Sequence, residues 1–549
     1  MDKKPKHTFT AGTIAGDAIA GVSVAGLMLP EAVAYAAIAG LAPGRAIVAA
    51  VAGGLAYAAL GRSRFAIVAP TSSSAAILAA ALAAMPGTAN DKAMMATAIV
   101  AIVAALFGII ALFRLGSLAG FIARPVLRGF AFGLAITIIL RQLPGLTGVH
   151  VTASNIFSLV GILASRLSEM SIYSIAIGGV ALAGILAMRR VGKLPGALIV
   201  LCCGIGLASL VDLPSHGVAL VGDIAIKLDE PAIPTFGFQT WSHLVQLAVP
   251  LTLILFAESW GTMRALALRH GDTLSANREL GALGGANFVA ALVQGMPVGA
   301  GFSAGSASEA AGAASRLTSA IAALALGALV LFAGQAVSRI PEPVLAAVVI
   351  AALTHALALS PFNRLFRIDR DQWIALAAVA GVIGFGVLDG MLIAVALSLG
   401  ALLHRLSRPT VSELGRIGTS HDFVDLVRHG DAKPVAGFAI YRPNAPLFFA
   451  NADAALNAID ALAVQHPAGT RVILSLEESN DLDSSALEAL AEFGKLIQNR
   501  EMVLRLARTH DRVRDLLAAA GMAELAEDAN FSVADSVDAA EEERNVDHA

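Results

Sequence analysis

Long apolar runs recur through residues 1–408, and they constrain the fold more than any other feature of the chain. A helix needs roughly 20 apolar residues to cross the hydrocarbon core of a bilayer, which is about 30 Å thick. Because hydrocarbon cannot satisfy backbone polar groups, such runs must form helices that bond their own N–H and C=O groups. The sequence therefore predicts fourteen membrane segments. A further apolar stretch at 154–168 is short, and it either lies on the membrane surface or crosses the membrane. The fourteen segments lie near residues 15–40, 44–60, 66–85, 94–113, 121–140, 171–188, 194–211, 244–268, 280–296, 299–314, 317–337, 342–359, 372–388 and 390–404.

The charge distribution changes at Arg408. Residues 1–408 carry 26 Lys+Arg and 17 Asp+Glu, whereas the remaining residues carry 12 and 24. The first part is poor in charge, as a membrane domain is, and the second has the composition of an ordinary soluble domain. With 57% hydrophobic and 14% charged residues overall, a disordered chain or a nucleic-acid-binding protein is excluded.

Basic residues also predict the orientation of the chain, because Lys and Arg collect in cytoplasmic loops. If the N-terminus is inside and the chain crosses fourteen times, twenty basic residues fall in inner loops and six in outer loops. One missed crossing would remove this asymmetry. We therefore expect both ends of the chain to be cytoplasmic.

Two segments at the same place in each set of seven are interrupted by Pro and Gly. Pro70 precedes Thr71 and three serines in the third segment, and Pro297 precedes a Gly- and Ser-rich stretch that contains Ser303 in the tenth. The helix from Thr71 to Met85 would rise only about 22 Å, and the one from Ser303 only about 20 Å, so neither spans alone. Such pairs are typical of discontinuous helices in inverted-repeat transporters, whose N-terminal ends suit an anion. The alternative is that Gly and Ser simply allow close helix packing.

Carboxylates inside membrane segments are costly and usually functional. Glu31 and Glu258 lie in the middle of the corresponding segments one and eight. A carboxyl group near the midplane can carry a proton, so Glu258 is a candidate coupling group; alternatively, Arg264 or Arg128 neutralises it structurally.

Three further carboxylates of the membrane segments are not expected to take part in transport. Asp17 and Asp389 lie near predicted segment ends and are expected at the membrane interface. Glu309 is expected to pair with Arg316, about two turns further along the chain.

The chain contains several long motifs that resemble those of a known protein family. They are DAIAGVSVAGLMLPEAVAYAAIAGLAP, SRFAIVAPTSSSA, RPVLRGFAFGLAITIILRQLPGLTG, ANFVAALVQGMPVGAGFSAGSASEAAGAAS and IPEPVLAAVVIAAL. In this order they resemble segments one, three, five and nine to twelve of the SulP family, the sulfate permease-type anion transporters related to solute carrier family 26. The resemblance implies a polytopic α-helical membrane protein of fourteen segments in 7+7 inverted repeats, with core and gate domains. It also implies an anion held between the N-termini of segments three and ten, a cytoplasmic C-terminal domain and a homodimer.

The chain departs from the family pattern at two positions of the expected site. Ala304 follows Ser303 where the family usually has Arg, and Glu31 stands where Gln is common. One positive charge is missing and one negative charge is added, so a doubly charged anion should bind poorly unless a carboxyl is protonated. We therefore expect proton–anion symport, with sodium held by Glu258 and Thr262 as the rival coupling ion. The expected substrate-binding residues are Glu31, Tyr35, Thr71, Ser72, Phe302, Ser303 and Ala304.

The soluble part alternates between strands and helices, which predicts a small α/β sheet. VAGFAIYRP, PLFFANA, RVILSLEE and MVLRLAR are predicted strands. The stretch SLEESNDLDSSALEAL resembles the strand, loop and helix start of the sulfate transporter and anti-sigma-factor antagonist (STAS) domain. Ser484 occupies the phosphoacceptor position of that domain by resemblance, although capping of a helix by Asp483 or Ser484 explains it equally well.

These observations lead to one predicted function. The sequence contains no HExxH helix and no phosphate-binding loop, and its twelve histidines are too scattered to form a metal cluster. The chain is therefore not expected to be an enzyme, and we expect no cofactor beyond a coupling ion. We predict a secondary active transporter of sulfate, bicarbonate or a dicarboxylate in a bacterial inner membrane. A sodium-coupled bicarbonate symporter, an uncoupled anion channel or exchanger and, less well matched, a nucleobase carrier are the alternatives. The predicted boundaries are a cytoplasmic N-terminus at 1–13, a transmembrane transporter domain at 14–408, a linker at 409–433, a STAS domain at 434–525 and a partly disordered acidic tail at 526–549.

Overall fold

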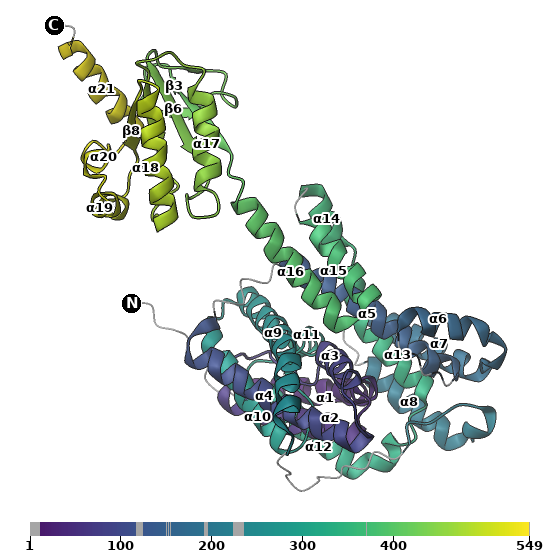
Figure 1. The fold of residues 1–549 in the computed structure, drawn as a ribbon. Helices are drawn as coiled ribbons and strands as arrows, with labels where there is room; N and C mark the ends of the chain where they lie inside the picture. The colour runs from purple at the N-terminus through teal and green to yellow at the C-terminus, as the bar shows by residue number, and fades with distance from the viewer. Residues whose placement is uncertain are drawn as a thin grey trace. The chain divides into compact units, whose positions relative to one another are not determined.

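The computed structural model describes residues 11–116, 124–149, 151, 153, 155–191, 196–222, 235–368 and 371–547. The chain forms two compact units, the first ending at Ser398 and the second beginning at Leu399, so the division falls within the last long helix of the membrane part, α16 (Val387–Leu406) (Figure 1). Residues 1–10 of the predicted cytoplasmic N-terminus lie outside the described residues.

The first unit is built from helices and two very short strands. Each of the fourteen predicted segments corresponds to a helix or to a strand followed by a helix, and the stretch 154–168 is a ten-residue helix, α6, too short to cross a bilayer. Among the described helices α1, α2, α4, α5, α7, α9 and α12 are long and apolar enough to span a membrane. The first half contains α1 (Ala11–Ala39), α2 (Pro43–Leu60), β1 (Val68–Ala69), α3 (Ser72–Ala83), α4 (Ala89–Leu112), α5 (Arg124–Thr147), α6 (Ile156–Ser165), α7 (Ile172–Val191) and α8 (Gly196–Leu210). The second half contains α9 (Phe238–Arg269), α10 (Ala276–Leu292), β2 (Gly299–Ala300), α11 (Phe302–Ala310), α12 (Leu317–Val337), α13 (Glu342–Leu353), α14 (Ser360–Ile368), α15 (Gln372–Phe385) and α16 (Val387–Leu406).

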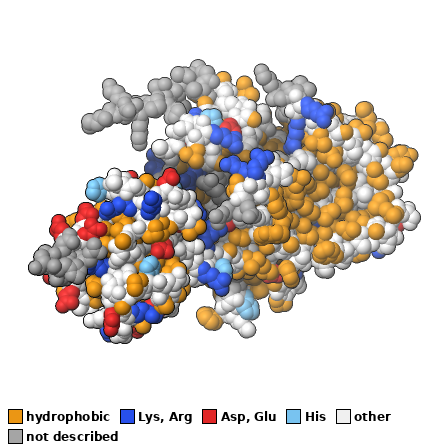
Figure 2. All heavy atoms as spheres, turned by 90° about the horizontal axis from the view of Figure 1, so that it is seen from above, with side chains coloured by type: hydrophobic (Ala, Val, Ile, Leu, Met, Phe, Trp, Pro, Cys, Tyr) orange, Lys and Arg blue, Asp and Glu red, His pale blue; other side chains and the backbone are white. Residues whose placement is uncertain are grey.

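The helices of this unit fall into two groups (Figure 1). In the first group, α10 packs against α2 and α4, α1 packs against α2, α3, α11 and α12, and α9 packs against α4. In the second group, α15 packs against α5, and α13 packs against α5 and α7. Gly129 allows the close approach of α5 to α15, because a Cβ there would overlap the carbonyl oxygen of Ala375. Figure 2 shows hydrophobic side chains over much of the visible surface of this unit, as expected for a surface that faces lipid.

The two interrupted segments meet at their strands. β1 and β2 pair antiparallel, with Val68 opposite Ala300 and Ala69 opposite Gly299. The half-helices α3 and α11 begin directly after these strands and are only 12 and 9 residues long. The predicted discontinuous helices are thus present, and their N-terminal ends lie beside a shared two-stranded pairing inside the unit.

The second unit is a sheet with helices on both faces. Its strand order is β4-β3-β6-β7-β8, with β5 paired to β3, and β6, β7 and β8 run parallel. The bounds are β3 (Val411–Ile417), β4 (Phe423–Asp425), β5 (Ala432–Lys433), β6 (Phe438–Pro443), α17 (Ala452–Ala463), β7 (Arg471–Ser475), α18 (Ser484–Asn499), β8 (Val503–Ala507), α19 (Asp511–Ala519), α20 (Ala523–Glu527) and α21 (Val533–Asp547).

Three predictions for this unit were wrong. The predicted linker at 409–433 supplies β3, β4 and β5, and the predicted strand PLFFANA is a turn that leads into α17. The acidic tail is not disordered over residues 533–547, where it forms α21. Val533 and Val537 of α21 are buried against Ile440 and Ile473 of the sheet. The tail appeared solvated in the sequence because its acidic residues outnumber these few apolar ones.

Candidate functional site

A cavity of about 180 Å³ lies where the two half-helices begin. Its polar lining comes from α1, α3, α9 and α11, which belong to the first helix group. The polar or charged side chains that line it are Glu31, Tyr35, Thr71, Ser72, Ser73, Glu258 and Ser303. The cavity is large enough for a small anion and some water.

On the α11 side, the cavity brings a carboxylate to the start of a half-helix. Ser303, in the first turn of α11, donates a hydrogen bond from Oγ to Oε1 of Glu31 at 3.1 Å. Glu31 comes from the middle of α1 and is only 7% exposed. Gly301 is the N-cap residue of α11, so no side chain caps this helix.

On the α3 side, a second carboxylate meets the other half-helix. Glu258 of α9 accepts hydrogen bonds at Oε2 from Thr71 Oγ1, at 3.3 Å, and from Ser73 Oγ. Thr71 also caps α3, because its Oγ1 accepts from the backbone N–H of Ser74 while the Ser74 hydroxyl accepts from the N–H of Thr71.

Buried polar side chains hold the paired strands in place. Asn287 of α10 accepts from the N–H of Val298 and donates to its carbonyl oxygen, both at 2.9 Å. Ser259 of α9 accepts from the N–H of Ala300 at 2.9 Å, and Ser74 of α3 donates to the carbonyl oxygen of Pro297 at 3.2 Å. The β1–β2 pairing and the two half-helix ends are therefore fixed by neighbours from both halves of the chain.

The opposite wall of the cavity is apolar. It is formed by Leu127, Phe130 and Leu134 of α5 and by Leu353 at the end of α13, which belong to the second helix group. Phe302, which is 39% exposed, adds a further apolar face beside Ser303. The two walls of the cavity thus come from different groups of helices.

No Lys, Arg or His lines the cavity among the described residues. Neither Glu31 nor Glu258 forms an ion pair within the described part of the chain, so the expected structural alternative for Glu258, a pair with Arg264 or Arg128, is not what the structure shows. The positive potential in the cavity comes from the N-terminal ends of α3 and α11 and from hydroxyl hydrogens.

The structure brings eight of the nine predicted binding and coupling residues to this cavity. The exception is Thr262, a buried residue one turn along α9 from Glu258, whose methyl group faces Gly305 of α11 and which does not line the cavity. Sequence reasoning missed Ser73 as a partner of Glu258. Its position within the run of hydroxyl residues after Pro70 was the available signal.

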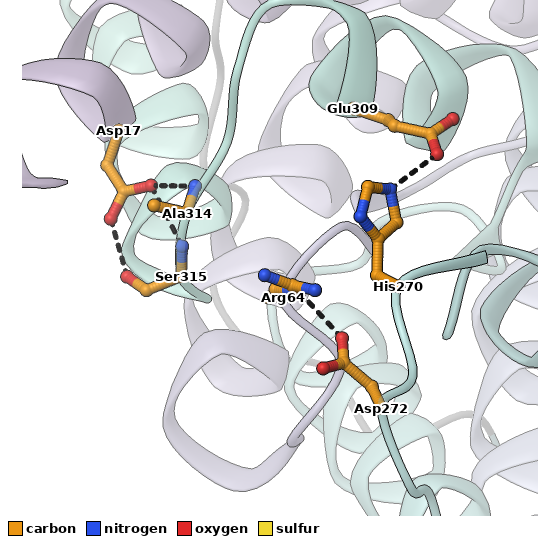
Figure 3. A network of polar contacts seen from close by, with 7 residues as sticks. All are labelled: Asp17, Arg64, His270, Asp272, Glu309, Ala314 and Ser315. Atoms are coloured by element: carbon orange, nitrogen blue, oxygen red, sulfur yellow. Dashed lines mark hydrogen bonds and ion pairs between the residues drawn. The ribbon is translucent and has the colours of Figure 1, made fainter. Parts of the chain in front are cut away.

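Two further carboxylates of the membrane segments have described contacts (Figure 3). Asp17 lies near the start of α1 and is fully buried within the protein, and it accepts hydrogen bonds from the N–H groups of Ala314 and Ser315 at 2.7 and 2.9 Å. Glu309 pairs with Arg269 and His270, at 2.9 and 2.8 Å, and not with Arg316. Arg316 instead donates to backbone carbonyl oxygens at the end of α2. Side-chain reach across helices, which spacing along one helix does not reveal, decides these pairs.

Two further expectations concern sites outside the cavity. Ser484 is exposed at the first residue of α18, and Asp483 caps this helix by accepting from the N–H of Ala486 at 2.9 Å. The described residues contain no group of three or more His, Cys, Asp or Glu side chains placed to hold a metal ion.

Comparison with known sequences identifies relatives of both units. The profile of the sulfate permease family matches residues 14–379, and that of the STAS domain matches residues 430–540. A probable sulfate transporter of Mycobacterium tuberculosis is 33% identical over 518 residues, which cover 93% of this chain and 92% of the relative. High affinity sulfate transporter 2 of Stylosanthes hamata is 27% identical and covers 95% of this chain and 83% of its own length.

Solved structures show the same fold. The murine solute carrier 26 family member A9 anion transporter in the inward-facing state matches with a TM-score of 0.88 at 18% identity, over 96% of this chain and 92% of that one. The transmembrane domain of a cyanobacterium bicarbonate transporter, BicA, matches with a TM-score of 0.62 at 19% identity, over 71% of this chain and 99% of that one. The predicted fold class is confirmed: fourteen membrane segments in two inverted repeats of seven, followed by a STAS domain.

Proposed function

The chain belongs to the sulfate permease family, a family of anion transporters and not of enzymes, and we propose that it is a secondary active transporter that couples uptake of a small oxyanion to protons. The observation that carries the proposal is the cavity at the two half-helix ends, where Glu258 is hydrogen-bonded to Thr71 and Ser73 with no basic side chain nearby among the described residues.

The charges in this cavity support proton coupling. Two like charges about 4 Å apart repel by about 4 kcal/mol at the effective dielectric constant of 20 found near protein surfaces. An anion beside an ionised Glu258 therefore binds poorly, whereas a protonated Glu258 removes the repulsion and can donate a hydrogen bond. Each proton that Glu258 takes up thus favours one bound anion, which is the thermodynamic basis of symport.

Sulfate and bicarbonate are the proposed substrates. Sulfate transporters are among the sequence relatives, and a bicarbonate transporter is among the structural neighbours. Ala304 provides no positive charge beside Ser303, which favours an anion that carries a single charge or is accompanied by protons. A dicarboxylate is the remaining candidate, because the apolar wall of α5 can accept a short carbon chain.

The construction of the cavity supports an alternating-access mechanism. Its polar wall and its apolar wall belong to two groups of helices, and the polar wall is held as one body by the contacts around β1 and β2. A displacement of the apolar wall along the polar wall would expose the same binding groups to either side of the membrane.

The test is uptake of labelled sulfate, bicarbonate and succinate into proteoliposomes with an imposed proton gradient, comparing the wild type with Glu258→Gln. Wild type should accumulate one of these anions above equilibrium, and the variant should only equilibrate it. Asp389→Asn, which changes an exposed carboxylate of α16, is the matched control and should behave as wild type. Accumulation that follows a sodium gradient and ignores the proton gradient would assign the coupling to sodium, and uptake that never exceeds equilibrium would indicate a channel or a facilitator.

We also propose the assembly and location expected from the sequence. These are a homodimer in a bacterial inner membrane with both termini in the cytoplasm, and phosphorylation of the exposed Ser484 as a means of regulation. The mass of the detergent-solubilised protein by light scattering tests the dimer. Protease access to the STAS domain in right-side-out and inverted vesicles tests the orientation.

A further inference from the structure

Each half-helix begins at a glutamate that comes from the other repeat. Glu31 of the first repeat contacts Ser303 of α11 in the second repeat, and Glu258 of the second repeat contacts Thr71 and Ser73 beside α3 in the first. The two ends at which an anion would be expected therefore already hold carboxylates of the protein itself. The two glutamates differ in how firmly their neighbours hold them, which gives them different roles.

The α3 end is closed by its own residues. Thr71 and Ser74 form a reciprocal capping box there, so the first N–H groups of α3 are partly satisfied without a ligand. Glu258 is in addition held by two hydroxyl groups. A carboxylate with these partners is expected to stay in place when an anion arrives.

No side chain caps the α11 end. Its N-cap residue is Gly301, which has no side chain to cap the helix, and the first N–H groups of an α-helix have no acceptor within the helix. Glu31 is held there by one hydrogen bond, from Ser303 at 3.1 Å. Its second oxygen, Oε2, accepts no hydrogen bond from the described residues, although the side chain is only 7% exposed and lines the cavity.

We propose that the Glu31 carboxylate is a tethered anion that occupies the α11 end of the cavity and competes with the transported anion for it. This inference rests on the proposed transport function and identifies Glu31 as the residue that sets the apparent affinity for the substrate. The substrate takes the place of the carboxylate at the N-terminus of α11 and at the Ser303 hydroxyl. Glu31 leaves this position when it is protonated, because a neutral carboxyl group is a poor ligand for a helix N-terminus.

The competition makes affinity depend on pH. The only other titratable groups that line the cavity among the described residues are Tyr35, one turn along α1, and Glu258 of α9. α3, α11, α5 and α13 contribute only hydroxyl groups, backbone and apolar side chains to it. Acid should therefore lower the KM for the anion in wild type by protonating Glu31. Removing the charge of Glu31 should lower the KM at alkaline pH without any acid.

Two substitutions separate occupancy from simple repulsion. Glu31→Gln removes the charge, whereas Glu31→Asp keeps it and shortens the side chain by one methylene, which withdraws the carboxylate from Ser303. If Glu31 acts by occupying the α11 end, both variants should bind the anion more tightly than wild type at pH 8. If only its charge matters, Glu31→Asp should resemble wild type.

The experiment measures the KM for labelled sulfate and bicarbonate uptake into proteoliposomes at pH 6 and pH 8. For wild type, the KM should rise by at least about tenfold between pH 6 and 8, the size expected for loss of one hydrogen bond to a charged group. At pH 8 the KM of Glu31→Gln should be about tenfold lower than that of wild type, and the KM of Glu31→Asp should approach that of Glu31→Gln; the pH dependence that remains in Glu31→Gln comes from Glu258. Glu258→Gln, which removes the other carboxylate, should lose gradient-driven accumulation and should keep the roughly tenfold change in KM that Glu31 causes.

The outcomes distinguish this inference from the proposed function. A KM in Glu31→Gln that equals the wild-type value at pH 8, or an unchanged KM in Glu31→Asp, overturns the tethered anion while leaving the transport function in place. Absence of uptake by wild type and by all variants, in protein that elutes as a single species, overturns both. If Glu31→Gln does not yield folded protein, the Glu31→Asp comparison and the pH dependence of KM in Glu258→Gln decide the question.

Discussion

The buried carboxylate of Asp17 offers a quantitative test of how α1 is attached to the second repeat. Asp17 Oδ1 accepts from the N–H groups of Ala314 and Ser315, at 2.7 and 2.9 Å, and from Thr318 Oγ1 at 2.8 Å, while Oδ2 accepts from Ser315 Oγ at 2.5 Å. The two backbone donors lie directly before α12, and Thr318 lies in its first turn, so one side chain of α1 fixes the segment that leads into a helix from a distant part of the chain (Figure 3).

The cost of removing this carboxylate follows from these contacts. A hydrogen bond to a charged group contributes about 1.5 to 3 kcal/mol, and Asp17 accepts four of them. Since the contributions share one side chain and are not additive, we expect Asp17→Ala to lower the free energy of unfolding by about 3 to 5 kcal/mol. Asp17→Asn keeps one acceptor oxygen and should cost about 1 to 2 kcal/mol.

The assay is equilibrium unfolding of the purified protein in mixed micelles with increasing dodecyl sulfate. Asp389→Asn is the matched control, because Asp389 is an exposed carboxylate in another membrane segment, and its change should stay within about 0.5 kcal/mol of wild type. An Asp17→Ala protein as stable as the Asp389 variant would refute the view that this carboxylate fixes α1 to α12.

Three further predictions concern packing and the soluble unit. Gly129→Ala places a methyl group against a backbone carbonyl of α15 and should reduce the yield of folded protein. The control is Gly161→Ala, whose methyl group meets nothing within 4 Å and should leave the yield unchanged. The yield is measured as the amount of protein that elutes as a single species in size-exclusion chromatography. Val537→Asp places a charge in the buried contact between α21 and the sheet, so it should destabilise the STAS domain by more than about 3 kcal/mol and make it sensitive to limited proteolysis of the full chain. The Ser412 hydroxyl donates to Asp425 at 2.6 Å and holds the pKa of that carboxyl below its usual value. This stabilisation is present above about pH 4, the usual pKa, and is lost as the pH falls through the folded-state pKa. Ser412→Ala should therefore increase proteolysis at pH 7 and make no difference in strong acid. Equal proteolysis of the variant and the wild type at pH 7 would contradict this prediction.

The membrane segments were predictable because each depends on local sequence. An apolar run of sufficient length has no alternative but to span, and the interruptions at Pro70 and Pro297 predict the two half-helices from spacing alone. The position of Glu258 in the middle of an apolar run predicted that it belongs to a site, and the structure places it in the cavity. The resemblance to a known family then supplied the order in which these pieces assemble.

Partners across helices were not predictable from the sequence. Glu309 has a suitable basic residue seven positions away, yet the bend after α9 brings Arg269 and His270 closer. The contact between Glu31 and Ser303 joins positions 272 residues apart and exists only because the two repeats interlock. In the soluble unit, α21 contributes few apolar residues, and only the presence of an exposed sheet face makes their burial favourable.

The charge balance of the cavity connects the proposed coupling with the choice of substrate. Each helix N-terminus contributes about half a positive charge, so α3 and α11 together provide about one. With Glu31 and Glu258 both ionised, the cavity carries about one net negative charge and repels any anion. With both protonated, it carries about one positive charge, which a monovalent anion such as bicarbonate neutralises and a divalent anion such as sulfate exceeds. Because no basic side chain of the described residues lines the cavity to balance a second charge, we expect a monovalent anion to be preferred once both glutamates hold their protons.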